Sequence, residues 1–372
     1  MSITIHQSPS GYASAHSELW HVVESTNKAV SGFQYVFDIY KAGNLVTRVK
    51  NSPYGSNKVG VLDVHNIVRA SLPTISLQSV PAFDFDTVTE LGQDVFWSDY
   101  DVRYGEVSGG VTTANIASGT HRVYNNYPRP VFDVAESEIT GAMILSNRPT
   151  ESYFYGTPTI PTIVSVFYPS GQTFVRQEKV NGSVTNSHTN TGNGNAFVFG
   201  YVPTSDNATL EISGSVSGLI GSINFKKKCS KYDAHTLVFL NAYGAYDSFT
   251  FVYGKKTIDN EKKKFEQLKW TLSNNQMVEK VSGVYNESSK VYASEFGMKM
   301  QLTSDILSTA EYNWLSELIN SPLVYYFDVN TEDYIPVMIT DTNYEFKDDR
   351  INKTDFLTLN IEFSDKTNTQ FR

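Results

Sequence analysis

The sequence of 372 residues contains a single cysteine, Cys229. One cysteine cannot form an internal disulfide, and it excludes zinc sites that need several thiolates. We therefore expect a fold held together by apolar cores, with Cys229 as a buried, apolar thiol that has no catalytic base beside it. The absence of disulfides is compatible with synthesis in a reducing compartment.

The chain is also poor in charge and in long apolar runs. Charged residues make up 19% of it, and no apolar run reaches the ~18 residues that a membrane-spanning helix needs. The first residues show neither the basic nor the apolar stretch of a secretory signal peptide. The formal net charge of −9 argues against a surface that holds nucleic acid or anionic lipid. We expect a protein without membrane contact.

Patterns that carry enzyme chemistry are missing as well. The seven histidines include no pair at the i, i+4 spacing of a helical metal site, and HExxH, GxSxG and Walker motifs do not occur. The acidic segment Asp328–Asp333 lacks the glycine and the final glutamate of a calcium loop, so we expect a solvated turn there. The sequence predicts no catalytic residue, no cofactor and no metal, and hence no enzyme.

Aromatic residues are abundant, with 23 Tyr and 22 Phe. Such side chains fit the pleated, half-buried surface of a sheet, and a hydrophobic content of 40% is enough to form real cores. In the segment 33–40, four apolar residues alternate with their neighbours, a turn follows at 42–44, and 45–49 returns, which predicts a hairpin. Turn residues recur at the short intervals of a β-sandwich. The fold class is therefore mainly β.

We predict three domains from these patterns. Residues 1–135 and 136–228 are each expected to form a β-sandwich module of immunoglobulin or fibronectin type. Residues 229–372 are expected to form a β-rich domain with one main helix. Within the second module, the polar stretch 181–195 is interpreted as a binding loop or, preferably, as a solvated hairpin tip.

The clearest helix pattern covers 309–320. Ser308 and Glu311 have the spacing of a capping box, and Pro322 ends the helix because it has no N–H to donate. Two strand patterns follow, at Tyr334–Thr340 and Phe356–Phe363. Four apolar residues at helical spacing are predicted to pack this helix onto the C-terminal sheet: Trp314, Leu315, Leu318 and Ile319.

The segment Lys255–Lys264 is the most charged part of the chain. We interpret it as a linker or as the tip of a long hairpin between 249–253 and 265–272. Its lysines suit contact with an acidic partner. A solvated turn that discourages edge pairing explains them equally well.

Three groups of segments carry a family pattern. The first comprises FQYVFDIYKAGNLVTRVK (33–50), SPYG (52–55), GVLDVHNIVRASL (60–72) and WSDYDVRYGE (97–106). The second is CSKYDAHTLVFLNAYGAYDSFTF (229–251). The third comprises WLSELINSPLVYYF (314–327), YIPVMIT (334–340) and LTLNIEF (357–363). Together they resemble structural proteins of tailed phages that infect Bacteroidetes, of the crAss-like or Flavobacterium-phage type.

This resemblance implies a virion protein of the phage tail, made in the host cytoplasm. It implies a C-terminal domain of tail-tube or hub type in a homo-oligomeric ring, with other tail or neck proteins as neighbours. DNA would pass through the ring without sequence-specific binding, and the acidic segments 328–333 and 346–350 are candidates for the channel surface. The basic segment Lys255–Lys264 would then lie away from the channel. The alternative is a receptor- or glycan-binding tail component, suggested by the many Tyr and Trp residues and by the stretch 181–195.

Overall fold

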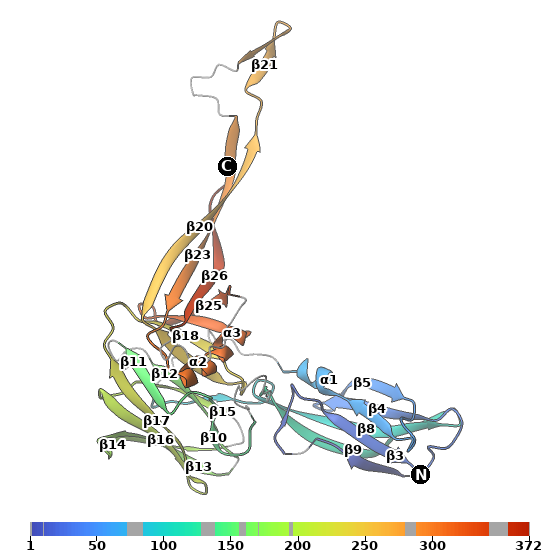
Figure 1. Ribbon diagram of the computed structural model, residues 1–372. Helices are drawn as coiled ribbons and strands as arrows, with labels where there is room; N and C mark the ends of the chain where they lie inside the picture. Colours follow the sequence, from blue (N-terminus) through green and yellow to red (C-terminus); the bar gives the residue numbers. More distant parts are fainter. Residues whose placement is uncertain are drawn as a thin grey trace.

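The computed structural model describes residues 2–9, 11–72, 85–127, 138–155, 161–169, 171–192, 196–279, 288–341 and 356–371. Strands dominate these residues and form six sheets. Two sandwich modules and a C-terminal sheet make up the body, and a narrow arm projects from that sheet (Figure 1). The mainly β fold class with β-sandwich modules is confirmed.

The N-terminal module packs a small sheet against a larger one. The small sheet has the order β1 (Ile3–Gln7), β3 (Trp20–Ser25), β6 (Gly60–Asp63). The larger has the order β2 (Ala13–Ser14), β9 (Val111–Tyr124), β8 (Trp97–Ser108), β4 (Gln34–Lys41), β5 (Asn44–Asn51). A short helix, α1 (His65–Arg69), follows β6. The predicted hairpin is confirmed, because Lys41 pairs with Asn44 across Ala42 and Gly43. Both turn residues have positive φ, as a two-residue hairpin turn that matches the strand twist requires.

The second module is also a pair of sheets. One has the order β10 (Met143–Ile144), β12 (Thr162–Phe167), β15 (Ala196–Tyr201), β7 (Thr89–Leu91). The other has the order β11 (Glu151–Tyr155), β17 (Gly218–Lys228), β16 (Asn207–Gly214), β13 (Thr173–Val180), β14 (Ser183–Thr191). The strand β7 precedes β8 in the chain but pairs with β15. A boundary near residue 135 therefore does not separate the two modules.

The polar stretch 181–195 is mostly a regular strand, and its interpretation as a loop or a hairpin tip is wrong. Residues 183–191 form β14, which pairs with β13 along its length, and only Asn181 and Gly182 form the turn. Residues 193–195 lie outside the described residues. As an edge strand, β14 exposes much of its surface to solvent, so its residues are polar without being a loop.

The C-terminal sheet has seven strands and carries the arm. Its order is β19 (Tyr246–Phe251), β18 (His235–Leu240), β24 (Val324–Asp328), β25 (Asp333–Ile339), β26 (Thr358–Phe371), β23 (Ser289–Thr303), β20 (Tyr253–Glu266). The predicted capping box of Ser308 and Glu311 is confirmed. The single helix predicted over 309–320 is divided at Leu315 into α2 (Thr309–Trp314) and α3 (Ser316–Asn320). The ψ of −8° at Leu315 departs from the α-helical value of about −42° and breaks the regular helix.

One apolar core joins all three parts of the body. Phe167 of β12 packs its ring against Phe96 and Tyr124 of the N-terminal module, with ring centroids 5.9 and 5.6 Å apart. The same buried cluster includes Val238 and Tyr325 of the C-terminal sheet. Because close-packed cores deform little, the modules form a single base and not a flexible string of domains.

Candidate functional site

The most unusual feature of the chain is the arm. Strands β20 and β23 pair from Tyr253 opposite Thr303 to Glu266 opposite Ser289, with one shift of register between Lys263 and Lys264. The third strand, β26, pairs with β23 up to Phe371 opposite Ala293. A strand rises about 3.3 Å per residue, so the 14 residues of β20 alone span roughly 46 Å. Figure 1 shows this ribbon rising away from the body.

The basic segment Lys255–Lys264 lies inside β20, and the prediction of a linker or hairpin tip is wrong. The strand β19, expected to pair with residues 265–272, pairs with β18 instead. Every residue from Lys255 to Glu266 is exposed. A strand with solvent on both faces does not show the apolar alternation by which strands are recognised in sequences, and lysines on a sheet edge limit unspecific pairing.

A second, smaller hairpin extends the arm. It consists of β21 (Trp270–Ser273) and β22 (Gln276–Glu279), joined by Asn274 and Asn275. Both asparagines have positive φ, 47° and 62°, which is the conformation of a two-residue hairpin turn. Among the described residues, neither strand pairs with any strand but the other. An isolated two-stranded hairpin is at best marginally stable in water.

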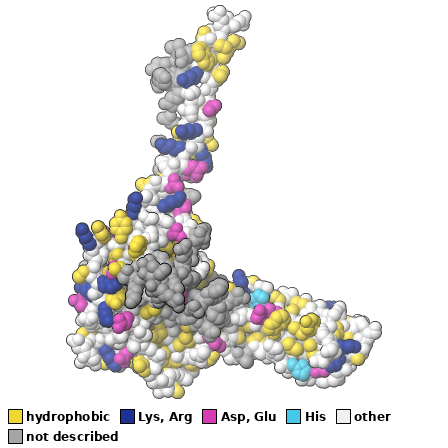
Figure 2. Space-filling view, viewed as in Figure 1, with side chains coloured by type: hydrophobic (Ala, Val, Ile, Leu, Met, Phe, Trp, Pro, Cys, Tyr) yellow, Lys and Arg dark blue, Asp and Glu magenta, His cyan; other side chains and the backbone are white. Residues whose placement is uncertain are grey.

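This hairpin and the residues before it expose a set of large apolar side chains, which we call the tip patch. Their exposed fractions lie between 39% and 66%. Figure 2 shows hydrophobic side chains gathered near the far end of the arm. Contiguous exposed apolar surface usually marks a binding site. The tip patch comprises Leu268, Trp270, Leu272 and Met277, together with Val278, which lies on the other face of the hairpin from Leu272 and Met277.

The part of the arm formed by β20, β23 and the chain between them differs from the rest of the chain in charge. Residues 253–303 contain nine lysines and six acidic residues, a net charge of +3, which leaves −12 on the remainder. Two ion pairs link the strands of the arm, Lys263 Nζ to Glu295 Oε1 at 2.7 Å and Lys299 Nζ to Asp259 Oδ2 at 2.8 Å. The hydrogen bonds to these carboxylates raise the pKa of both lysines. A basic arm on an acidic chain is electrostatically complementary to other copies of that chain.

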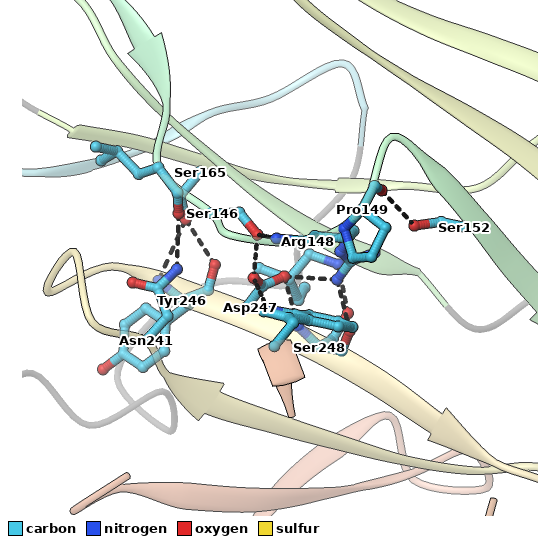
Figure 3. A network of polar contacts seen from close by, with 12 residues as sticks. Ser146, Arg148, Pro149, Ser152, Ser165, Asn241, Tyr246, Asp247 and Ser248 are labelled. Atoms are coloured by element: carbon cyan, nitrogen blue, oxygen red, sulfur yellow. Dashed lines mark hydrogen bonds and ion pairs between the residues drawn. The ribbon is translucent and has the colours of Figure 1, made fainter. Parts of the chain in front are cut away.

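A buried polar network fixes the C-terminal sheet to the second module (Figure 3). Arg148 Nη2 lies 2.5 Å from Asp247 Oδ1, and the two side chains are only 5% and 1% exposed. The other carboxylate oxygen of Asp247 accepts hydrogen bonds from Ser146 Oγ and from Trp314 Nε1. The two sheets are also joined nearby, where Ser165 Oγ of β12 donates to the carbonyl of Tyr246 in β19 at 2.7 Å. This network anchors the sheet from which the arm projects.

A second buried carboxylate, Glu317 of α3, lies beside this network. It accepts hydrogen bonds from Asn147 Nδ2 at 2.6 Å and from the Ala242 amide at 3.0 Å. Burial raises the pKa of Glu317 to about 7, and the negative charge of Asp247 adds to the increase, whereas the two hydrogen bonds oppose it. Burial disfavours the charged carboxylate because its charge is poorly solvated inside the protein, and Asp247 disfavours it through repulsion between like charges.

The raised pKa of Glu317 predicts a pH-dependent stability. Because the folded pKa lies above the ordinary value of 4.5, the folded chain binds this proton more tightly than the unfolded chain. The resulting stabilisation is complete below that value and is lost as the pH rises to about 7. The free energy of unfolding in urea is measured for Glu317→Gln and for the wild type. Between about pH 5 and about pH 8, we expect the difference between them to shift in favour of the variant by on the order of 2 kcal/mol. The exposed Glu332→Gln is the control, and an equal pH dependence of E317Q and the wild type would contradict the burial effect.

The residues predicted to pack the helix onto the sheet lie together. Trp314, Leu315 and Leu318 are buried in one cluster with residues of β18 and β24, and Ile319 is partly buried against it. Cys229, by contrast, is exposed, and its prediction as a buried thiol is wrong. It directly follows β17, which ends in three lysines, and begins the connector to β18.

The tip patch could have been found in the sequence, but the network could not. Asn274-Asn275 between two short apolar segments is a recognisable hairpin pattern. Arg148 and Asp247, however, are separated by 99 residues. No local pattern reports such a pairing.

The segment Asp328–Asp333 joins β24 to β25. Asp328 Oδ1 accepts a hydrogen bond from the Asn330 amide at 2.9 Å, as in an Asx turn. In the described parts of the chain, no group of three or more His, Cys, Asp or Glu residues could hold a metal ion. No described helix has the length and hydropathy needed to cross a membrane.

Comparisons with known proteins concern the fold only. No protein-family model matches the chain, and no curated protein matches it. Fibronectin(III)-like modules of CbhA from Clostridium thermocellum are 10% identical, covering 61% of this chain and 94% of theirs, with a TM-score of 0.18. Extracellular domains 3–5 of Drosophila OTK are 11% identical over 80% of this chain and 92% of theirs, at a TM-score of 0.22. The titin I-band fragment I67–I69 is 8% identical over 81% of this chain and 93% of its own length, at a TM-score of 0.21.

Proposed function

We propose that the chain is a structural subunit that assembles with copies of itself, the arm of one copy binding the body of the next. The observation that carries this proposal is the arm, which exposes a patch of large apolar side chains far from its own body. Soluble monomers seldom expose contiguous apolar surface of this kind without a partner for it. The arm has a structural use once a second copy covers the patch.

The free energy gained by burying the tip patch can be compared with the free energy that association costs. Fully burying a large apolar side chain contributes about 1.5–3 kcal/mol, and the five side chains are 39–66% exposed, so covering them supplies roughly 4–8 kcal/mol. Association costs roughly 4–15 kcal/mol in lost freedom of motion. Contact with a complementary surface therefore offsets part of the cost of joining two copies, and ion pairs between the arm and the neighbouring copy add to this contribution.

The arm and the body are different surfaces, so the contact is head to tail. Repeated head-to-tail contacts close into a ring when the rotation between copies allows it. The charges of +3 on residues 253–303 and −12 elsewhere favour arm-to-body contact and disfavour contact between two arms. The lysines on the edge strand β20 restrict pairing to an acidic partner, which makes the association selective.

On the basis of the resemblance to tail proteins of Bacteroidetes phages, we propose that the chain is a ring, tube or hub subunit around the DNA channel. Duplex DNA carries about one negative charge per 1.7 Å of axis, so an acidic or neutral channel releases it readily. The exposed turn at 328–333 is one candidate for the channel surface. The other acidic segment, 346–350, lies outside the described residues. The basic strand β20 would face a neighbouring subunit and not the channel.

Shortening the arm tests the proposal. A variant in which Asn-Gly replaces residues 260–296 keeps Asp259 opposite Gly297, which already pair. In sedimentation velocity, we expect the wild type to form multimers and this variant to stay monomeric, with the body melting as a folded unit. Leu272→Ser is the milder variant, because it removes one side chain of the tip patch. Val216→Ser, at an equally exposed site on the second module, is its control. A monomeric wild type, or multimers that survive without the arm, would refute the proposal.

A further inference from the structure

A cleft of about 640 Å³ lies between the N-terminal module and residues 138–140, just before β10 of the second module. Its walls come from the segment between β1 and β3 and from residues 138–140. Tyr12 and Trp20 supply the accessible aromatic surface, Trp20 being 41% exposed, whereas Leu19 and Ile139 line the cleft from the core and are only 2% and 1% exposed. Cavities of this size with aromatic walls typically receive apolar groups of a ligand.

The charged groups in the described lining of the cleft are of one sign. Its described lining includes two carboxylates, Glu18 and Glu138, but no lysine, arginine or histidine. Both glutamates are exposed, and neither takes part in an ion pair within the part of the chain that the structure describes. They remain available to a cationic partner.

We propose that this cleft is the surface of one copy that receives the tip patch of the next; this inference rests on the proposed head-to-tail assembly. Trp270 and Leu272 of the incoming arm would pack against Trp20 and Tyr12. Aromatic anchors that fill a pocket typically dominate the affinity of an interface.

The lysines of the arm match the two glutamates. Lys262, Lys264 and Lys290 are exposed on β20 and β23, near the end of the arm, and form no ion pair among the described residues. Carboxylates at the rim of the cleft attract the ammonium groups of these lysines and fix the register of the arm in the cleft. Hydroxyl and amide groups of the lining, among them Gln7, Ser8 and Ser17, can bond the open backbone edges of the small hairpin.

A second cleft of similar size, beside α2, is less suited to this role. Its carboxylates already have partners. Asp305 pairs with Lys228 at 3.1 Å, Glu151 pairs with Lys226 at 3.0 Å, and Glu311 is held in the capping box. The ammonium group of Lys228 also lies 3.9 Å from the centre of the Tyr153 ring. A basic arm would therefore meet a cation in this second cleft and no unpaired acid.

The test uses two full-length variants that are defective on opposite sides of the contact. Trp20→Ala with Glu18→Lys disables the cleft but leaves the arm, whereas the arm-shortened variant keeps the cleft. We expect each to be monomeric alone, and an equimolar mixture to form a one-to-one complex and nothing larger. The single variant Trp20→Ala is expected to weaken assembly at least about tenfold, a change of about 1.4 kcal/mol. Tyr54→Ala, which removes an exposed aromatic side chain elsewhere on the same module, is the control and should assemble normally.

The outcomes separate the two proposals. Cleft variants that assemble like the wild type, while the arm-shortened variant does not, would overturn the assignment of the cleft and leave arm-mediated assembly intact. A wild type that never associates would overturn the proposed function itself. Thermal melting of each variant shows whether loss of assembly comes from loss of folding, and the one-to-one complex requires that both variants be folded.

Discussion

Replacing Asp247 by Ala is expected to lower the free energy of unfolding by about 3–5 kcal/mol, the usual cost of leaving a buried charge without its partner. The guanidinium group of Arg148 would remain almost fully buried with no counter-charge. Trp314 and Ser146 would also lose the acceptor of their hydrogen bonds. Urea unfolding followed by circular dichroism measures the change.

The control removes both charges together. Arg148→Met combined with Asp247→Leu replaces the ion pair by apolar side chains, which is often neutral or even stabilising. We expect this double variant to recover most of the stability that Asp247→Ala loses. A loss below about 1 kcal/mol for the single variant, the size of a surface pair, would show that the network does not anchor the C-terminal sheet.

Leu318→Ala is expected to cost about 2–5 kcal/mol, because it opens a cavity between α3 and the sheet. Leu318 is fully buried in the cluster that also holds Leu237, Phe239 and Leu302. Leu268→Ala is the matched control, since Leu268 is 65% exposed on the arm and its truncation should change stability by less than about 0.5 kcal/mol.

The same pair of variants distinguishes packing from assembly. Leu318→Ala should shift the melting midpoint of the monomeric, arm-shortened chain as much as that of the full chain. If its melting is unchanged but it no longer assembles, then the helix residues form a contact between subunits and not part of the core. Leu268→Ala should show the reverse behaviour, with normal folding and weaker assembly.

The direction in which the arm projects is set by the shared core of the base. The shared core around Phe167 holds the N-terminal module and the C-terminal sheet in one body. The cleft and the root of the arm therefore keep a fixed separation and direction. In a ring, such rigidity lets every subunit present the same geometry to the next, whereas flexible linkers would spread the copies over many arrangements.

Local patterns in the sequence predicted the mainly β fold, the hairpin at 33–49 and the capping box of Ser308 and Glu311. These features depend on residues a few positions apart, and each has a distinct physical signature. The division of the helix at Leu315 was not predicted, because the apolar stripe continues across the break.

Features that depend on distant residues could not be predicted. The strand β7 leaves the first module to pair with β15, a partner more than 100 residues away. Lys255–Lys264 belongs to a long strand, although its composition is typical of a loop. Because both faces of the arm are in solvent, this strand lacks the apolar alternation by which strands are recognised. Of the candidate site, only the small hairpin at Asn274-Asn275 has a local signal, and the cleft is assembled from segments that are remote in the sequence.

The position of the arm in the assembled particle tests self-association most directly. Electron cryomicroscopy of the assembled chain would locate it. If the arm joins the subunits, the tip patch of each copy lies against the body of its neighbour, and Lys262, Lys263 and Lys264 face that neighbour and not the channel. A particle in which the arms project freely into solvent, a channel lined by these lysines, or a chain present as a single copy would contradict it.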